Sequence, residues 1–318
     1  MDSMSMNVLF ERVLNKERHR FSVNEFQFRT ALQNVKEAYL PNKDWPGKMT
    51  VLYADYNDPA HRCAYLHKYA MCHTGMVQDL LWDAAFKLGA ILRRQLRWKL
   101  RLNLCSLGGG PGTDVVAILD LLTAFFDFFP CFVSIVDLTE GWKGVFESTL
   151  QELRNGPNWR LRDILSPFYF HYNYITANLL QPLRPSVKRY LKDADFISMV
   201  KFISAAACAD TRAMIAEIFS CMKPGAIVIF IDNAAGGFLQ VLQEQAESHG
   251  LLTVHGPVEH YCHENFFYYV DRFGCPSQWK TLVSFQMWIK PHSYNPDQLL
   301  QKKLLPVRAD VKCSKIEA

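Results

Sequence analysis

The sequence predicts an α/β fold whose core is a mainly parallel sheet with helices on both faces. Seven short apolar segments alternate with segments of helical periodicity, and this alternation is typical of crossover connections between parallel strands. The apolar segments are continuous, as expected for strands that are covered on both faces. The chain has 318 residues, of which 49% are hydrophobic and 21% charged. This composition excludes disorder, collagen and coiled coil as the main state.

The second half of the chain supplies the strands and most of the helices that cover them. Strands are expected over residues 102–107, 132–137, 171–176, 196–200, 226–231, 251–255 and 281–289. Helices are expected over residues 114–126, 141–154, 185–192, 210–222 and 237–249. Because each helix follows one strand and precedes the next, the connections are those of repeated crossover units.

The first third of the chain has a different pattern. Residues 21–99 are mainly helical in periodicity, and Pro59 marks the start of a short helix. We therefore divide the chain into a helical extension over residues 1–100, a sheet domain over 101–290 and a polar tail over 291–318.

Charge and cysteine content exclude several classes of protein. The formal net charge of +4 is too small to predict nucleic-acid binding by itself. The most apolar stretch, residues 119–138, is interrupted by Asp120, Asp127 and Pro130, so no membrane span is expected. The start of the chain does not have the pattern of a secretory signal, and the nine cysteines are scattered. Reduced thiols in a cytoplasmic or nuclear protein are the expectation.

A glycine-rich loop follows the first predicted strand. Gly108, Gly109, Gly110 and Gly112 lie between that strand and a helix, where glycine allows positive φ and a close approach of backbone to ligand. The helix start beyond it favours an anion. A nicotinamide enzyme would need glycine or alanine at the position of Thr113. No Gly-Lys-Ser/Thr follows either, so the loop is not a P-loop.

The order of these elements resembles that of class I S-adenosylmethionine-dependent methyltransferases. The likeness covers residues 102–290: a strand, the GGGPG loop, a helix and a second strand that ends in Asp137. The resemblance implies a Rossmann-like, seven-stranded sheet with an antiparallel last strand. It also implies S-adenosylmethionine as the cofactor of the domain over residues 101–290.

The resemblance assigns binding roles to individual residues. The acid at Asp137 is expected to accept from the ribose hydroxyls, because a carboxylate can accept from two neighbouring hydroxyls, and Asn178 is expected beside the adenine. The family usually has an acid where this chain has Ser106. We therefore assign the ammonium group of the methionine part to Asp114. An equally good interpretation is that Asp114 only stabilises the helix dipole.

Two aromatic segments are expected to cover the strand ends. Tyr65 and Tyr69 are one helical turn apart, and the resemblance implies that Tyr65 contacts the methionine part of the cofactor. We expect residues 59–76 and the later insertion 259–280 to form the acceptor pocket together. A packing stripe of aromatic side chains is the alternative for the tyrosines. The first 50 residues are expected to be dispensable for this lid.

The expected function is methyl transfer to an oxygen or nitrogen nucleophile of a small-molecule or macromolecular acceptor. The candidates for a catalytic base, by position alone, are Lys201, Asp232 and His260. The Asn/Asp-Pro-Pro-aromatic motif of amino-group methyltransferases is absent after the fourth strand. The alternative is a non-catalytic sensor or scaffold that binds S-adenosylmethionine.

Two further patterns have plain interpretations. A basic stretch over residues 87–101 is compatible with RNA phosphates, but a solvated helix face is the favoured interpretation. Histidines and cysteines over residues 255–275 match no standard zinc spacing. No metal is therefore expected.

Overall fold

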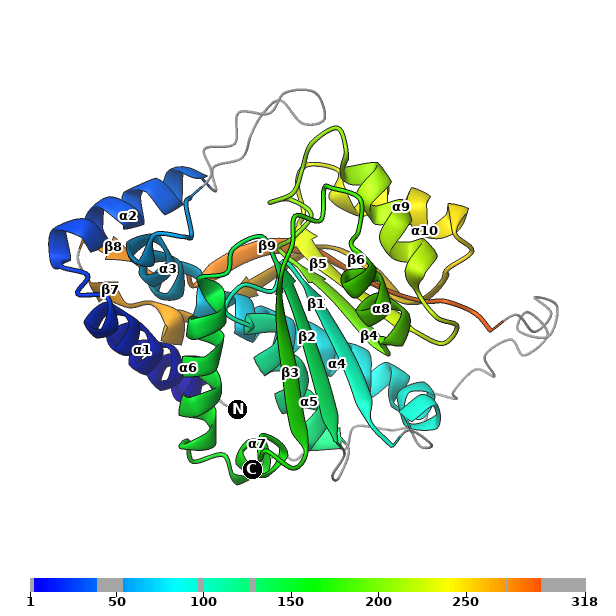
Figure 1. Ribbon diagram of the computed structural model, residues 1–318, viewed down its shortest axis with the longest axis horizontal. Coiled ribbons are helices and arrows are strands. Elements are labelled where there is room, and N and C mark those ends of the chain that lie inside the picture. The colour runs from blue at the N-terminus through cyan, green and yellow to red at the C-terminus, as the bar shows by residue number, and fades with distance from the viewer. Residues whose placement is uncertain (1–2, 39–53, 97–99, 126–129, 273, 293–318) are drawn as a thin grey trace, which may run out of the picture.

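The computed structural model describes residues 3–38, 54–96, 100–125, 130–272 and 274–292 (Figure 1). The principal strands are β1 (Leu102–Leu107), β2 (Cys131–Asp137), β3 (Phe170–Thr176), β4 (Phe196–Val200), β5 (Ile227–Asn233), β6 (Leu252–Glu264) and β9 (Lys280–Ile289). The α-helices that accompany them are α5 (Thr113–Phe125), α6 (Trp142–Arg154), α7 (Trp159–Ile164), α8 (Pro185–Asp193), α9 (Thr211–Cys221) and α10 (Phe238–Ser248).

These strands form one seven-stranded sheet with the order β3-β2-β1-β4-β5-β9-β6. The neighbouring strands from β3 to β5 are parallel. The last strand, β9, pairs antiparallel with β5 on one side and with β6 on the other. The predicted fold class, a mainly parallel seven-stranded sheet with an antiparallel last strand, is confirmed.

The sheet separates two hydrophobic cores. Along β1, Leu104 belongs to the core that it shares with α4 (Met71–Leu96), α5 and α6, whereas Cys105 belongs to the core shared with α8, α9 and α10. Successive side chains of a strand point to opposite faces, so β1 contributes to both cores. Figure 1 shows α9 and α10 gathered on one side of the molecule.

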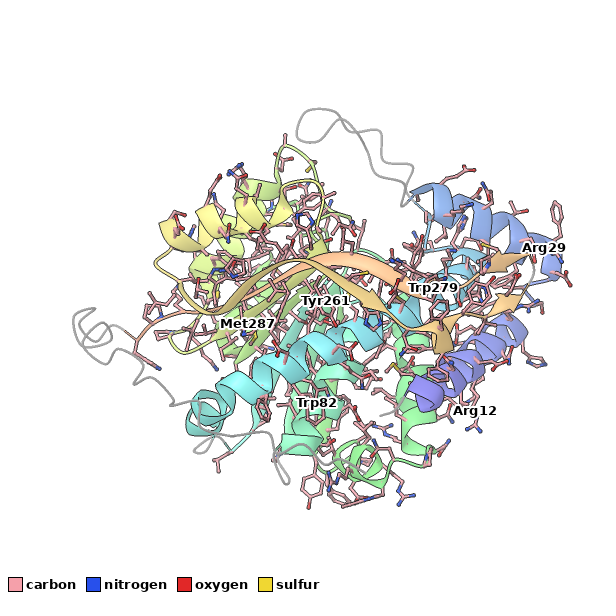
Figure 2. All side chains as sticks on the ribbon, turned by 180° about the vertical axis from the view of Figure 1, so that it is seen from behind. Arg12, Arg29, Trp82, Tyr261, Trp279 and Met287 are labelled. Carbon is pink, nitrogen blue, oxygen red and sulfur yellow. The ribbon has the colours of Figure 1, made fainter. Side chains whose placement is uncertain are left out.

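The helical extension packs against the sheet domain. It comprises α1 (Ser3–Arg20), α2 (Glu25–Ala38), α3 (Pro59–Tyr65), a π-helix η1 (Leu66–Ala70) and α4 (Met71–Leu96). Figure 1 shows α1, α2 and α3 close together at one end of the molecule. The long helix α4 covers the face of the sheet that is turned towards the viewer in Figure 2 and contacts β6 and β9 along its length. Met287 of β9 is buried, whereas Trp82 of α4 is 44% exposed.

The structure corrects the expectation that the first 50 residues are dispensable. Helix α1, which the sequence did not identify, contacts α3, η1, α4 and α6. Its Phe10 and Val13 are almost fully buried. Removing α1 would expose the apolar side chains that it covers, so the packing of residues 59–76, the predicted lid segment, depends on this helix.

The late insertion is also organised differently from the expectation. The strand expected over residues 251–255 continues as β6 to Glu264, with register shifts against β9. Gly256 has a φ of 86° and lies at one of these irregularities, which concealed the continuous strand from the sequence pattern. The remainder holds a short 3-10 helix, η2 (Phe266–Tyr268), and two short strands, β7 (Asp271–Arg272) and β8 (Cys275–Pro276).

The other predicted elements agree with the structure to within one or two residues, and α7 was not predicted. No helix within the described residues is both long and apolar enough to cross a membrane.

Candidate functional site

The glycine loop has the backbone conformation that its sequence predicts. The φ angles of Gly108, Gly110 and Gly112 are 62°, 49° and 82°, in the region that disfavours other residues. At Gly109 a Cβ atom would lie 2.2 Å from Oγ of Ser106. Glycine is therefore favoured at all four positions. At Gly108, Gly110 and Gly112 the reason is the positive φ, and at Gly109 it is the clash that a Cβ atom would make.

Only one of these glycines leaves room for a Cβ atom without a clash. A Cβ on Gly108 would lie 2.4 Å from the ring of Phe202, and one on Gly112 would lie 2.5 Å from the ring of Phe146. On Gly110 the nearest atom would belong to the ring of Trp142, at the van der Waals distance of 3.8 Å. Gly110 is thus the least crowded of the four loop glycines.

Asp137, at the end of β2, fixes the position of Gly110. Its Oδ2 accepts a hydrogen bond from Gly110 N–H at 2.9 Å, and its Oδ1 accepts from Thr139 N–H at 2.9 Å. Burial raises the pKa of Asp137 to about 6. Each carboxylate oxygen can accept more than one hydrogen bond, so these two contacts leave Asp137 able to bind hydroxyl groups.

Asp114 lies beneath the loop, buried between α5, β1 and β4. Its Oδ2 accepts from the hydroxyls of Ser106 (2.7 Å) and Ser198. Its Oδ1 has no hydrogen-bond partner among the described residues, and burial raises the pKa of the carboxyl group. The hydroxyl of Ser106 thus connects the carboxylate of Asp114 to the end of β1.

Tyr174 of β3 is a site residue that the sequence did not identify. Its hydroxyl donates to Gly110 O at 3.3 Å, so β3 also supports the loop. Asn178, which follows β3, is exposed and its Oδ1 accepts from Leu180 N–H at 3.0 Å. The proposed contact of Asn178 with adenine stays a prediction.

The sequence matches no protein-family model and no curated protein. Among solved structures, it is similar to magnesium protoporphyrin IX methyltransferase of Synechocystis, at 12% identity over 87% of this chain and 97% of that chain, with a TM-score of 0.42. It is also similar to the N-methyltransferase NodS of Bradyrhizobium japonicum, at 12% identity over 65% of this chain and 86% of that chain, with a TM-score of 0.35. At these sequence identities and TM-scores the structural similarity is weak.

The strand order is what decides the fold. The last strand is inserted antiparallel between β5 and β6, the glycine loop follows β1, and the acid Asp137 ends β2. The chain has the class I methyltransferase fold.

In this methyltransferase fold, an aromatic cluster lies beside Gly110. The ring of Trp142, the residue nearest to the open side of Gly110, is 5.3 Å from the ring of Tyr65 and 5.0 Å from that of Tyr56. The ring of Tyr69 stacks on His73 at 5.5 Å. Tyr65 therefore lies near the loop, as the lid hypothesis requires, and it is also part of a packed aromatic stripe.

A buried arginine joins the start of α3 to the turn that precedes α6. Arg62 of α3 is 3% exposed and donates from Nη1 to the carbonyl oxygens of Tyr56 (2.7 Å) and Asn57 (2.9 Å). A Cβ atom on Gly141 would lie 2.3 Å from the same Nη1. The guanidinium thus fills the space beside the turn that leads from β2 into α6.

The two predicted lid segments contact each other. Lys68 Nζ donates to Pro276 O at 2.6 Å, and Gln278 N–H donates to Lys68 O at 2.7 Å. His67 Nε2 lies 2.9 Å from Cys275 O. The π-helix η1 is therefore clamped to the insertion that precedes β9. The role of these two segments as an acceptor pocket stays a prediction.

A second polar group lies where β4 and β5 end. Lys201 has a φ of 52°, and its Nζ donates to Asn233 Oδ1 at 2.6 Å and to Thr281 Oγ1 at 3.2 Å. Asp232 is fully buried and accepts from the N–H groups of Ser204 (2.9 Å) and Asn233 (2.7 Å). Burial raises the pKa of Asp232, and burial lowers the pKa of Lys201.

The two histidines His73 and His260 differ in burial. His73 is buried at the start of α4, close enough to Lys201 for the lysine charge to lower the histidine pKa further. Its Nδ1 lies 3.1 Å from the hydroxyl of Tyr65. His260, in contrast, is exposed on β6 with a φ of 55°. Lys201 and Asp232 thus lie together at the ends of β4 and β5. His73, which belongs to the predicted lid segment over residues 59–76, lies near Lys201 as well.

Two further sequence features concern metal ligands and basic side chains. Within the residues that the structure describes, no group of three or more histidine, cysteine or acidic residues could hold a metal ion. Most side chains of the basic stretch, including Arg93 and Arg97, lie outside the described residues.

Proposed function

We propose that the protein binds S-adenosylmethionine on the glycine loop and transfers its methyl group to an oxygen or nitrogen nucleophile. The observation that carries this proposal is the geometry of Gly110. A Cβ atom on any of the three other loop glycines would clash with a side chain, whereas at Gly110 the nearest ring is at van der Waals distance and Asp137 accepts from the backbone N–H. A loop built in this way suits a ligand that lies against the backbone.

The residues around the loop fit the chemical groups of the cofactor. Asp137 has acceptor capacity left for the two ribose hydroxyls. Asp114 has a buried Oδ1 without a partner among the described residues, which suits the ammonium group of the methionine part. Tyr65 and Asn178 remain our assignments for the methionine and adenine ends. The bound sulfonium supplies an activated methyl group, so the protein mainly aligns the acceptor with it.

A second candidate function is binding of S-adenosylmethionine without turnover. It is favoured by the hydrogen bonds that two of the candidate bases already make within the protein. The oxygens of Asp232 accept from two backbone N–H groups, and Lys201 Nζ already donates to two side-chain oxygens. A site that only binds its ligand needs no free base.

Product analysis separates these two functions. The protein is incubated with methyl-labelled S-adenosylmethionine and with pools of small molecules, peptides and RNA. A methyltransferase forms S-adenosylhomocysteine together with a labelled acceptor, whereas a sensor leaves the methyl donor intact. Asp137→Ala serves as the control, because its weaker binding should lower any enzymatic product. Formation of product that is unchanged in Asp137→Ala would contradict the proposed site.

A further inference from the structure

We propose that the methyl acceptor is a carboxylic acid, that Lys201 binds its carboxylate, and that the product is a methyl ester. This inference rests on the proposed function and adds to it the chemical class of the acceptor. Its basis is the group formed by Lys201, His73 and Asp232 at the ends of β4 and β5, next to the start of β9.

Lys201 is held in an unusual position. A φ of 52° is uncommon for a residue other than glycine, and such strain often occurs at functional sites. Its ammonium group lies across the ends of three strands, with one partner on β5 (Asn233) and one on β9 (Thr281). The backbone is held as well, because Lys201 N–H donates to Ile231 O at 2.8 Å.

The two side chains that accept hydrogen bonds from this ammonium group are neutral. Asn233 Oδ1 and Thr281 Oγ1 carry no charge, while an ammonium group has three protons to donate. The nearest acid, Asp232, directs its two oxygens to the N–H groups of Ser204 and Asn233. A carboxylate ligand would therefore meet a cation that still has a donor for it, and such charge-assisted hydrogen bonds are strong.

The same group lacks a good general base. Burial, together with the charge of Lys201, puts the pKa of His73 well below its usual value, so His73 has little tendency to take up a proton. Its Nδ1 is also within hydrogen-bond distance of Tyr65. An amine or alcohol acceptor has to lose a proton during methyl transfer. A carboxylate has already lost it.

The surroundings of Lys201 favour an apolar or aromatic body on this acid. The charge of Lys201 contributes to the lowered pKa of His73. The ring of His73 stacks on that of Tyr69, with 5.5 Å between the ring centroids. Tyr69 is 5.6 Å from Tyr65, and Tyr65 is 5.3 Å from Trp142 beside the glycine loop. A row of aromatic rings thus leads from His73 to the loop that we assign to the cofactor. Aromatic side chains pack well against flat apolar ligands.

The chemical step balances without a proton transfer. A carboxylate oxygen forms a bond to the methyl carbon while the bond between that carbon and sulfur breaks. The electron pair of the broken bond stays on sulfur. The products are a neutral methyl ester and S-adenosylhomocysteine, so the acceptor loses the charge that Lys201 binds, which favours release of the product.

The first part of the test measures binding. Benzoate and indole-3-acetate are compared with benzamide and indole-3-acetamide in the presence of S-adenosylhomocysteine, on wild type, Lys201→Met, Lys201→Arg and the control Lys143→Met. Lys143 is exposed on α6. We expect wild type and the control to bind the acids about tenfold more tightly than the amides. Lys201→Met should lose this preference, and Lys201→Arg should keep it, because arginine retains the charge but cannot act as a base.

The second part measures the product. With methyl-labelled S-adenosylmethionine, a methyl ester releases volatile labelled methanol in alkali, whereas N-methyl and ether products do not. We expect volatile label with the acids, none with the amides, and a loss of it in Lys201→Met. Equal binding of acids and amides, an acid preference that survives in Lys201→Met, or label that is stable to alkali would overturn the inference. Failure of the protein to bind S-adenosylmethionine or S-adenosylhomocysteine at all would instead refute the proposed function.

Discussion

Asp137 at the end of β2 holds Gly110 of the neighbouring loop through a hydrogen bond of 2.9 Å between Gly110 N–H and Oδ2. The same carboxylate accepts from Thr139 N–H. One side chain thus positions both the loop that we assign to the cofactor and the turn that follows β2. The pKa of Asp137, raised by burial to about 6, makes this contact sensitive to pH.

The first prediction concerns this pH dependence. In the folded protein Asp137 ionises near pH 6, and its reference value is 3.8. Between these values the folded state holds the proton more tightly, so the contribution of Asp137 to stability is fully present below about pH 4 and is lost as the pH rises through 6. Ribose hydroxyls bind the ionised form better. We therefore expect the affinity for S-adenosylmethionine to increase from pH 5 to pH 7 and then to level off.

Calorimetric titrations at pH 5, 6, 7 and 8 check this prediction. Asp137→Ala is the control and should show a flatter profile over the same range. A wild-type affinity that is constant between pH 5 and pH 7 would show that Asp137 does not contact the ligand through its ionised form.

The second prediction separates the two roles considered for Asp114. In Asp114→Asn the amide oxygen can still accept from Ser106 and Ser198, so the melting temperature should change little. The negative charge is lost, and the affinity for S-adenosylmethionine should fall about tenfold. Thermal unfolding and calorimetry are measured on the same sample. Unchanged affinity would leave Asp114 with a structural role only.

The third prediction compares two adjacent glycines. Gly110→Ala places a methyl group at the van der Waals distance of 3.8 Å from the ring of Trp142, without a clash, but at a φ of 49°, which costs about 1–2 kcal/mol. Gly109→Ala places one 2.2 Å from Ser106 Oγ and 2.9 Å from a methyl group of Ile135. We expect Gly110→Ala to fold and to lose ligand affinity, and Gly109→Ala to lose more stability. If Gly110→Ala binds normally, the ligand does not lie against this face of the loop.

The fourth prediction tests the dependence of the lid on α1. Phe10 is 1% exposed, whereas Val8, on the same helix, is 42% exposed. Phe10→Ala should lower the free energy of unfolding by about 3–5 kcal/mol, and Val8→Ala should have little effect. Denaturant unfolding provides the measurement. Similar unfolding midpoints for the two variants would mean that α1 is not part of the folded core.

The strands and the glycine loop were predictable because their signals are local. Continuous apolar runs identify strands buried on both faces, and the left-handed φ of Gly110 follows from its place between a strand and a helix. The partners of Lys201 were not predictable in this way. Asn233 and Thr281 are 32 and 80 residues away in the chain, and only the sheet order brings them together.

Contacts between residues far apart in the chain also explain the other differences between the sequence predictions and the structure. Ser198 reaches Asp114 across 84 residues, and its place in β4 carries no signal of a polar contact. Helix α1 has a weak apolar pattern in sequence, so its burial becomes evident only when α3, η1 and α6 cover it. Contacts between distant elements thus determine the site, whereas local patterns determine the elements.

The central claim is that S-adenosylmethionine binds where Asp137 meets Gly110. The most direct measurement is a calorimetric titration of wild type and Asp137→Ala with S-adenosylmethionine, with NADH as the control ligand. We expect micromolar affinity in wild type, a loss of about 1.5–3 kcal/mol in Asp137→Ala, and no heat with NADH. Binding of NADH together with no heat from S-adenosylmethionine would contradict the account.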